Sequence, residues 1–192
     1  MRDRPSLAAV RRVGLAGAVL ASLVICASAT TVSAERSACT LVGTAGDDRL
    51  VGTRGDDVIC GFGGADRIRG GRGIDLIYGG AGSDQISGGL GDDAVAGGRG
   101  KDRLNGGRGR DRVLGQRGPD LSLSGGAGRD QVDGGPGRDR CLLAADGSSG
   151  DRVDGGPSED WARGDPGDRF RRVEVFPSFL YREPVPTPPP GG

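Results

Sequence analysis

Residues 43–114 read GTAGDDRLV GTRGDDVIC GFGGADRIR GGRGIDLIY GGAGSDQIS GGLGDDAVA GGRGKDRLN GGRGRDRVL. Each of these eight nine-residue units has Gly at positions one and four, Asp at position six and an aliphatic residue at position eight. A fixed period sustained over many units is typical of a solenoid, in which each unit packs only against its neighbours. The stretch therefore predicts a repeat architecture rather than a conventional globular core.

The register continues past residue 114 with one interruption. Unit nine, GQRGPDLSLS, holds one additional residue, and GGAGRDQVD and GGPGRDRCL complete the array at residue 142. Counted from each first glycine, position eight holds Leu50, Ile59, Ile68, Ile77, Ile86, Val95, Leu104, Val113, Ser122, Val132 and Cys141. Only Ser122, in the unit with the insertion, is clearly polar.

The composition excludes an ordinary globular interior. Glycine accounts for 40 of 192 residues, aromatic residues for only 4%, and histidine is absent. A chain so poor in large apolar groups either stays disordered or is held together by something besides apolar burial.

The pattern resembles the hemolysin-type calcium-binding (RTX) repeat, G-G-x-G-x-D-x-U-x, in which U is a large aliphatic residue. The resemblance covers residues 43–142 and implies an all-β fold, a right-handed parallel β-roll (β-solenoid) that binds Ca²⁺. The sequence departs from this repeat at position two, where Thr44, Thr53, Phe62 and Gln116 replace glycine.

Strand geometry alone supports the same architecture. In the triplet x-U-x the aliphatic side chain points inward, because alternate residues of a strand face opposite sides. Two units then complete one coil of eighteen residues, with neighbouring coils paired in parallel about 4.8 Å apart. We expect Asp48, Asp66, Asp84, Asp102 and Asp120 to stack along one edge. Asp57, Asp75, Asp93 and Asp111 should stack along the other.

Stacked carboxylates need a counter-ion, because like charges about 4.8 Å apart repel. Ca²⁺ accepts six to eight oxygen ligands, whereas Mg²⁺ demands tighter octahedral geometry, and zinc or copper would call for His or Cys. The predicted calcium ligands are Asp48, Asp57, Asp66, Asp75, Asp84, Asp93, Asp102, Asp111, Asp120, Asp130 and Asp139. A flexible linker that binds nothing, and a metal-free β-solenoid whose Asp residues only cap turns, remain the alternatives.

Charge is distributed unevenly along the repeats. Residues 43–96 hold nine Asp and five Arg, whereas residues 97–142 hold ten basic residues and six Asp. A cation beside a ligand carboxylate competes with Ca²⁺, so the N-terminal turns should fill first. The basic residues of the second half would either pair with neighbouring Asp or attract an anionic polymer.

The first 34 residues resemble an export signal. Four arginines precede an apolar stretch over residues 13–29, and Val32-Ser33-Ala34 forms a small-residue cleavage pattern. A membrane anchor is the alternative, but a cleaved signal peptide over 1–34 fits the short apolar stretch better. We therefore expect a secreted, extracellular protein with no membrane span in the mature chain.

Three cysteines follow the signal. Cys39 and Cys60 are separated by 21 residues, close to one coil, and export places them in an oxidising compartment, so a Cys39–Cys60 disulfide is expected. Two free thiols are the alternative. Cys141 falls at the inward position and is expected as a buried thiol rather than an intermolecular bridge.

The remaining segments flank the repeats. Residues 35–42 form a lead-in, and residues 143–181 are expected to form degenerate repeats and a C-terminal cap, because a solenoid must cover its open end. Trp161 is a candidate member of that cap, and a poorly ordered extension is the alternative. Residues 182–192 form a Pro-rich tail.

An enzyme is not expected. The chain has no His, no nucleophile motif and no phosphate loop, and nearly every acid falls in a repeat position. The predicted function is a secreted calcium-binding structural or surface module whose β-roll orders on Ca²⁺ binding between turns. An adhesion protein that binds an anionic cell-surface polymer is the alternative. Neither specific nucleic-acid binding nor ice binding is expected.

Overall fold

The computed structural model describes residues 38–140, 142–144, 147 and 150–175, and in these residues the repeats form a parallel β-solenoid of two eight-stranded sheets. The odd-numbered sheet contains β1 (Leu41–Val42), β3 (Val58–Gly63), β5 (Leu76–Ala81), β7 (Ala94–Arg99), β9 (Arg112–Arg117), β11 (Gln131–Asp133), β13 (Arg152–Asp154) and β15 (Arg169–Arg171). The even-numbered sheet contains β2 (Arg49–Val51), β4 (Arg67–Arg72), β6 (Gln85–Leu90), β8 (Arg103–Arg108), β10 (Ser122–Ala127), β12 (Leu142–Ala144), β14 (Trp161–Gly164) and β16 (Glu174–Val175).

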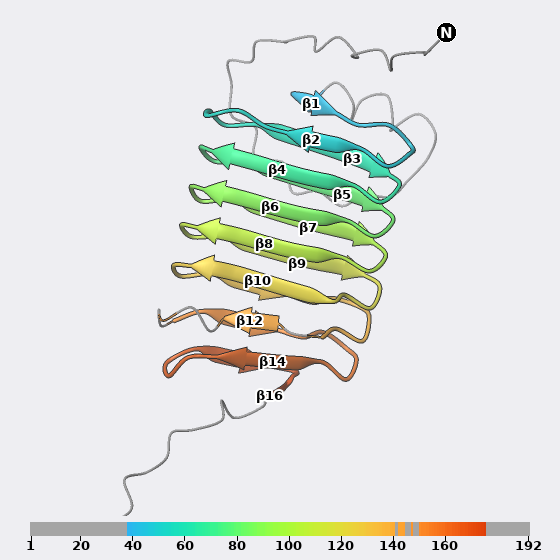
Figure 1. Cartoon of the computed structure of the whole chain (residues 1–192). Helices are drawn as coiled ribbons and strands as arrows, with labels where there is room; N and C mark the ends of the chain where they lie inside the picture. The colour runs from blue at the N-terminus through green and yellow to red at the C-terminus, as the bar shows by residue number, and fades with distance from the viewer. Residues whose placement is uncertain (1–37, 141, 145–146, 148–149, 176–192) are drawn as a thin grey trace, which may run out of the picture.

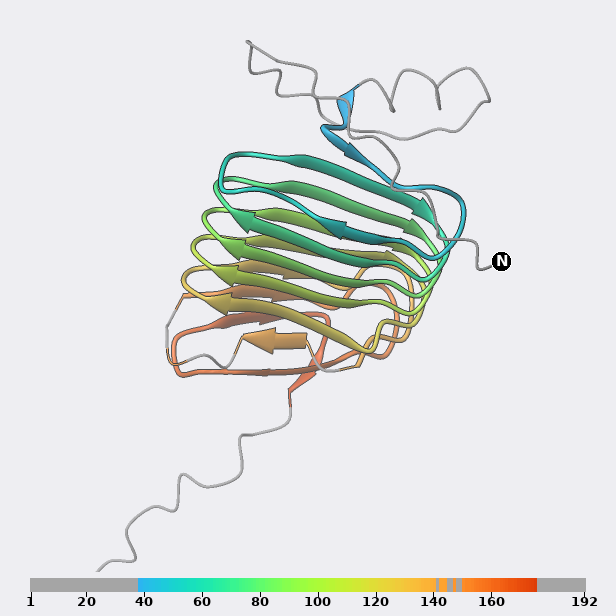
Figure 2. The same ribbon diagram turned by 45° about the horizontal axis from the view of Figure 1, so that its top comes forward.

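Each coil contributes one strand to each sheet, and the coils stack directly above one another (Figure 1). Seen from a second direction, a coil is a flattened loop with one strand on either side (Figure 2). Leu50 pairs with Ile68 and Ile59 pairs with Ile77, each eighteen residues further along the chain. This register confirms the coil of two units.

Most strands are longer than the expected triplet. In the central coils a strand runs from position seven of one unit through position three of the next, as in Arg67–Arg72. The glycines of the following unit still pair with the next coil, as Gly71 pairs with Gly89. The first half of the GGxGxD segment therefore belongs to the sheet, and the chain turns only after it.

The core is a single file of aliphatic side chains from each sheet, meeting between the two walls. The buried members are Leu50, Ile59, Ile68, Ile77, Ile86, Val95, Leu104, Val113, Leu123, Val132, Leu142, Ala144, Val153 and Ala162. Because each unit contributes about one such side chain, the interior is thin.

The structure corrects position eight in two units. In unit nine the inward residue is Leu123, fully buried and paired with Leu104, and not Ser122. In unit eleven it is Leu142, paired with Leu123, rather than Cys141, which lies outside the described residues. In both units an additional residue follows the Asp, so simple counting from the first glycine misplaces the strand by one residue. That shift turns the opposite set of side chains inward.

Position four needs glycine because adjacent coils approach closely there. Gly82 has φ +137°, and a Cβ on it would clash with the carbonyl oxygen of Gly64 in the preceding coil. At position two, Phe62 and Gln116 adopt φ values of +77° and +72°, which are uncommon for residues with a side chain. Thr44 and Thr53 instead form a different turn, in which each hydroxyl accepts a hydrogen bond from the N–H two residues later, at 3.1 Å.

The N-terminal end is closed covalently. Cys39 and Cys60 form a disulfide with a Cα–Cα distance of 6.1 Å, as expected, and so link the lead-in to β3. Closing a loop of this length contributes about 3 kcal/mol to the free energy of unfolding in the loop-entropy model. The signal peptide expected over residues 1–34 lies outside the described residues.

The C-terminal residues continue the roll. Strands β13 to β16 extend the same two sheets, and Phe170 and Val173 pack against the end of the core. Trp161 lies on the outer side of β14 with 37% of its surface exposed, so it does not join this apolar end. The rest of the expected cap, from residue 176 to 181, and the Pro-rich tail are outside the described part. No described helix has the length and apolar character needed to cross a membrane.

The corrected register can be tested by paired substitutions in β10. Leu123→Ala should lower the free energy of unfolding by about 2–5 kcal/mol, since it leaves a cavity in the thin core. Ser122→Ala should change it by less than about 0.5 kcal/mol, because the side chain lies on the outer face. Chemical denaturation of the folded protein measures both. Equal losses would mean that the strand is placed wrongly.

Candidate metal centre

The position-six aspartates point into the roll rather than out from its edges. Along the described chain, Asp66, Asp75, Asp84, Asp93, Asp102, Asp111, Asp120, Asp130 and Asp139 are at most 2% exposed, and Asp57 is 8% exposed. Glycine at position one makes this possible, because a Cβ on Gly79 would lie 2.4 Å from Oδ2 of Asp84. The position-one glycine therefore provides the space that the carboxylate occupies.

The carboxylates form two continuous ladders. The backbone N–H of each Asp donates to Oδ1 of the Asp one coil later, as from Asp66 to Asp84 at 2.9 Å and from Asp75 to Asp93 at 2.9 Å. One ladder contains Asp48, Asp66, Asp84, Asp102, Asp120, Asp139 and Asp160, and the other contains Asp57, Asp75, Asp93, Asp111, Asp130, Asp151 and Asp168. The two edges expected from the sequence are thus present, and they run further.

The second oxygen of the inner rungs is buried without a hydrogen-bond donor. Within the described chain this holds for Oδ2 of Asp66, Asp75, Asp84, Asp93, Asp102, Asp111, Asp120, Asp139 and Asp160. A carbonyl oxygen of the next coil lies beside it: a Cβ on Gly79 would be 2.4 Å from Asp84 Oδ2 and 2.6 Å from the carbonyl oxygen of Gly97. Two acceptors that lie near each other in a buried place call for a proton, a water molecule or a cation to satisfy them.

The first rungs of the ladders are different. Oδ2 of Asp57 accepts from the backbone N–H of Thr53 at 2.6 Å and from its hydroxyl at 2.9 Å. Thr44 donates to Oδ2 of Asp48 in the same way, at 2.5 and 2.9 Å. The two threonines that replace position-two glycine therefore satisfy the carboxylates that the inner rungs leave open.

The last rung of the second ladder is also satisfied. Oδ1 of Asp168 accepts from the N–H groups of Gly150 and Asp151, at 3.0 and 3.1 Å, and Oδ2 accepts from Asp165 N–H at 2.6 Å. The last rung of the first ladder, Asp160, keeps an open Oδ2, so only the second ladder is satisfied at this end.

Burial raises the pKa of the inner carboxyl groups. It raises the pKa of Asp84, Asp93 and Asp139 to about 6 and that of Asp111 and Asp120 to about 7, with smaller contributions from repulsion by neighbouring Asp. The N–H bond to Oδ1 lowers the pKa but does not offset the desolvation. Within the ladder, then, the carboxylate form is less favourable than in water, and an accompanying positive charge would stabilise it.

Sequence comparison agrees with this geometry. Four consecutive copies of the RTX calcium-binding nonapeptide repeat match residues 40–61, 61–95, 88–121 and 122–142, more than half of the chain. This protein belongs to the RTX calcium-binding repeat family. No curated protein matches it in sequence.

The RTX ladders have the donor chemistry that Ca²⁺ requires. Buried carboxylate oxygens without partners, with backbone carbonyl oxygens of the next coil beside them, are hard oxygen ligands. Among the described residues no three Asp, Glu, His or Cys side chains gather closely enough to hold a metal by themselves. A donor set of carboxylate and backbone carbonyl oxygens suits Ca²⁺ better than Mg²⁺ or Zn²⁺.

The ladders extend past the residues that match the family. Asp151 and Asp160 are buried and accept N–H bonds from Asp130 and Asp139, both at 2.8 Å. Sequence reasoning did not include these two residues, because the spacing between rungs rises to 21 residues there. The segments GDRVD and EDWAR carry the only signal, an Asp two residues before an inward apolar residue.

Among the residues that the structure describes, no arginine forms an ion pair with a ladder Asp. Of the ten basic residues in 97–142, only Arg138 forms an ion pair within the described chain, and its partner is Glu159 at 3.2 Å. The reason is the alternation of the strand: the ladder carboxylates point inward, while the basic residues beside them lie exposed on the outside. Arg–Asp pairs therefore do not replace a cation in the second half.

A pH titration in the absence of calcium tests the buried ladders. Because folding raises the pKa of these carboxyl groups from 3.8 to about 6–7, the folded state binds more protons between about pH 4 and pH 7. The free energy of unfolding must then fall as the pH rises through this window. We expect calcium-free protein to hold more β structure at pH 5 than at pH 8 by circular dichroism. The opposite trend would show that the carboxylates are not buried.

Proposed function

We propose that this protein is a secreted structural or surface module whose roll orders when Ca²⁺ binds between its coils. The observation that carries the proposal is the pair of buried ladders, whose inner Oδ2 atoms lack a hydrogen-bond donor and lie beside carbonyl oxygens. Each bound ion would neutralise carboxylates that otherwise repel one another along the ladder. An RTX β-solenoid is a structural fold, and we assign this chain no catalytic role.

The proposed ligands are the ladder residues of the repeats. They are Asp48, Asp57, Asp66, Asp75, Asp84, Asp93, Asp102, Asp111, Asp120, Asp130 and Asp139. The hydrogen bonds of Thr44 and Thr53 make Asp48 and Asp57 the weakest members of this set, because their second oxygens already have donors. Calcium affinity should accordingly be greatest at the inner rungs.

Export would supply the conditions that such a module needs. We infer a signal peptide over residues 1–34, followed by the lead-in 35–42, the repeats 43–142, the degenerate repeats and cap 143–181 and the tail 182–192. Extracellular calcium modules bind at about 10⁻⁴–10⁻³ M, so the roll would fold after export rather than inside the cell. The Cys39–Cys60 disulfide fits the same oxidising surroundings.

The direct test is a calcium titration followed by circular dichroism at pH 8. We expect little β structure without calcium and a cooperative gain at about 0.1–1 mM Ca²⁺, because binding and folding are coupled. Mg²⁺ at the same concentration is the control and should produce a smaller change. If chelation with EDTA leaves the spectrum of folded protein unchanged, the roll is a metal-free solenoid.

Matched pairs of Asp→Asn substitutions test which rungs bind. Asp66→Asn with Asp75→Asn should raise the calcium concentration needed for half-folding several-fold, because both carboxylates have an open Oδ2. Asp48→Asn with Asp57→Asn should change it little, since threonine already occupies those oxygens. Both pairs remove one carboxylate from each ladder, so they are matched in charge and differ in whether Oδ2 already has a donor.

A third pair tests the charge asymmetry. Asp102 and Asp111 follow the exposed cations Lys101 and Arg110, whereas Asp66 and Asp75 follow the neutral Ala65 and Ile74. A neighbouring cation weakens a calcium site by on the order of 1 kcal/mol. Replacing Asp102 and Asp111 by Asn should therefore cost less calcium affinity, measured by isothermal titration, than replacing Asp66 and Asp75. Equal losses would show that these outer cations have no influence on binding.

A further inference from the structure

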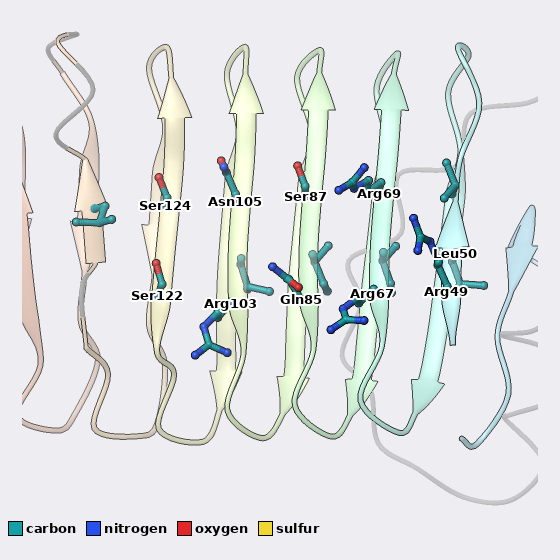
Figure 3. A pocket seen from close by; sticks show the side chains of 15 residues that line it. Arg49, Leu50, Arg67, Arg69, Gln85, Ser87, Arg103, Asn105, Ser122 and Ser124 are labelled. Carbon is teal, nitrogen blue, oxygen red and sulfur yellow. The ribbon is translucent and has the colours of Figure 1, made fainter. Parts of the chain in front are cut away.

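A groove crosses the outer face of the even-numbered sheet. It has a volume of about 770 Å³ and runs over β2, β4, β6, β8, β10 and β12. Position seven of successive strands supplies one row of side chains, Arg49, Arg67, Gln85 and Arg103 (Figure 3). Position nine supplies a parallel row, Arg69, Ser87, Asn105 and Ser124 (Figure 3).

The groove is cationic and nothing in the described chain neutralises it. Arg49, Arg67, Arg69 and Arg103 line it, and no acidic side chain is among the described residues that line it. None of these arginines forms an ion pair or a side-chain hydrogen bond in the described part of the protein, and all four are exposed. Their guanidinium groups therefore keep their full capacity to bind an anion.

The arrangement of the arginines favours an extended ligand. Arg49, Arg67 and Arg103 lie on β2, β4 and β8. The row therefore crosses three strand-to-strand steps of about 4.8 Å each and spans roughly 14 Å. The parallel row of Ser87, Asn105 and Ser124 offers hydroxyl and amide groups along the same direction. A ligand that follows the groove would meet acid-binding and hydroxyl-binding groups side by side.

We infer that this groove binds a linear acidic polysaccharide whose acid groups are carboxylates. The planar guanidinium fork of arginine matches a carboxylate in bidentate fashion, and the serine and asparagine side chains suit sugar hydroxyl groups. The inference goes beyond the proposed calcium function and depends on it only because the rows exist in the folded roll. It also changes which cations form the anion-binding surface, because Arg49, Arg67 and Arg69 lie before residue 97 and only Arg103 lies in residues 97–142.

Single-stranded nucleic acid fits the groove less well. Proteins that bind it combine a basic groove with aromatic side chains on which bases stack. No Phe, Tyr or Trp lines this groove. The neutral half of the lining offers hydroxyl and amide groups instead, which are matched to a sugar polymer.

The test compares two quadruple variants of the full-length, calcium-loaded protein. The groove variant carries Arg49→Gln, Arg67→Gln, Arg69→Gln and Arg103→Gln. The control variant carries Arg54→Gln, Arg72→Gln, Arg99→Gln and Arg108→Gln, which removes the same charge from exposed third positions outside the groove. Circular dichroism first establishes that calcium folds both variants as it does the wild type.

Binding is then measured by isothermal titration with hyaluronate, and with carboxyl-reduced hyaluronate as the neutral probe. We expect the wild type and the control variant to bind hyaluronate in a salt-sensitive manner, and the groove variant to bind about tenfold more weakly or worse. The neutral probe should bind none of the three proteins with comparable affinity.

Three outcomes would overturn the inference. The first is absence of hyaluronate binding by the folded wild type, and the second is an equal loss in both variants, which would indicate net charge alone. The third is tighter binding of a single-stranded DNA oligomer that depends on the groove arginines. A failure of calcium to fold the chain would appear separately in the circular dichroism, so it cannot be confused with a failure of the groove.

Discussion

The requirement to accommodate buried carboxylates governs this protein. An inner aspartate such as Asp84 accepts the backbone N–H of Asp66 in the preceding coil with Oδ1, while its Oδ2 has no hydrogen-bond donor and lies near the carbonyl oxygen of Gly97. A buried anion in such surroundings is costly unless a proton or a cation accompanies it. Glycine at position one leaves room for the carboxylate, because any side chain at Gly79 would collide with Asp84. Folding and cation binding therefore depend on the same carboxylate oxygen atoms.

The apolar interior is thin, so the need to accommodate the buried carboxylates remains important. Each unit buries about one Leu, Ile or Val, so nearly every inward aliphatic residue is accompanied by one inward carboxylate. In a conventional domain a buried charge is surrounded by many apolar side chains. In this protein, buried carboxylates and buried aliphatic side chains are nearly equal in number. At the ends of the ladders some carboxylates have hydrogen-bond donors. Thr44 and Thr53 donate to Asp48 and Asp57, and backbone N–H groups donate to Asp168.

Strand alternation separates two chemistries that are mixed in the sequence. Arginine and aspartate are adjacent in units such as GGRGRDRVL, yet the aspartate points inward and the arginines lie outside. This separation explains why the expected ion pairs do not form and why the outer face of the even-numbered sheet keeps a row of unneutralised arginines. The inside of the roll is thus suited to cations, and one of its outer faces to anions.

The repeat period by itself determined the coil of eighteen residues, the inward file from Leu50 to Val113 and the stacking of Asp48 to Asp120 in two rows. A solenoid places residues one period apart on top of one another, so spacing in the chain converts directly into position in space. The period could not locate an insertion within a unit, so it assigned Ser122 and Cys141 to position eight, where the inward residues are Leu123 and Leu142. It also stopped short of Asp151 and Asp160, where the spacing widens. Only the tertiary structure decided that the carboxylates turn inward over glycine, that two threonines close the first rungs, and that arginines from separate coils share one groove. Each of these depends on how side chains from different coils meet, which a pattern within one unit does not contain.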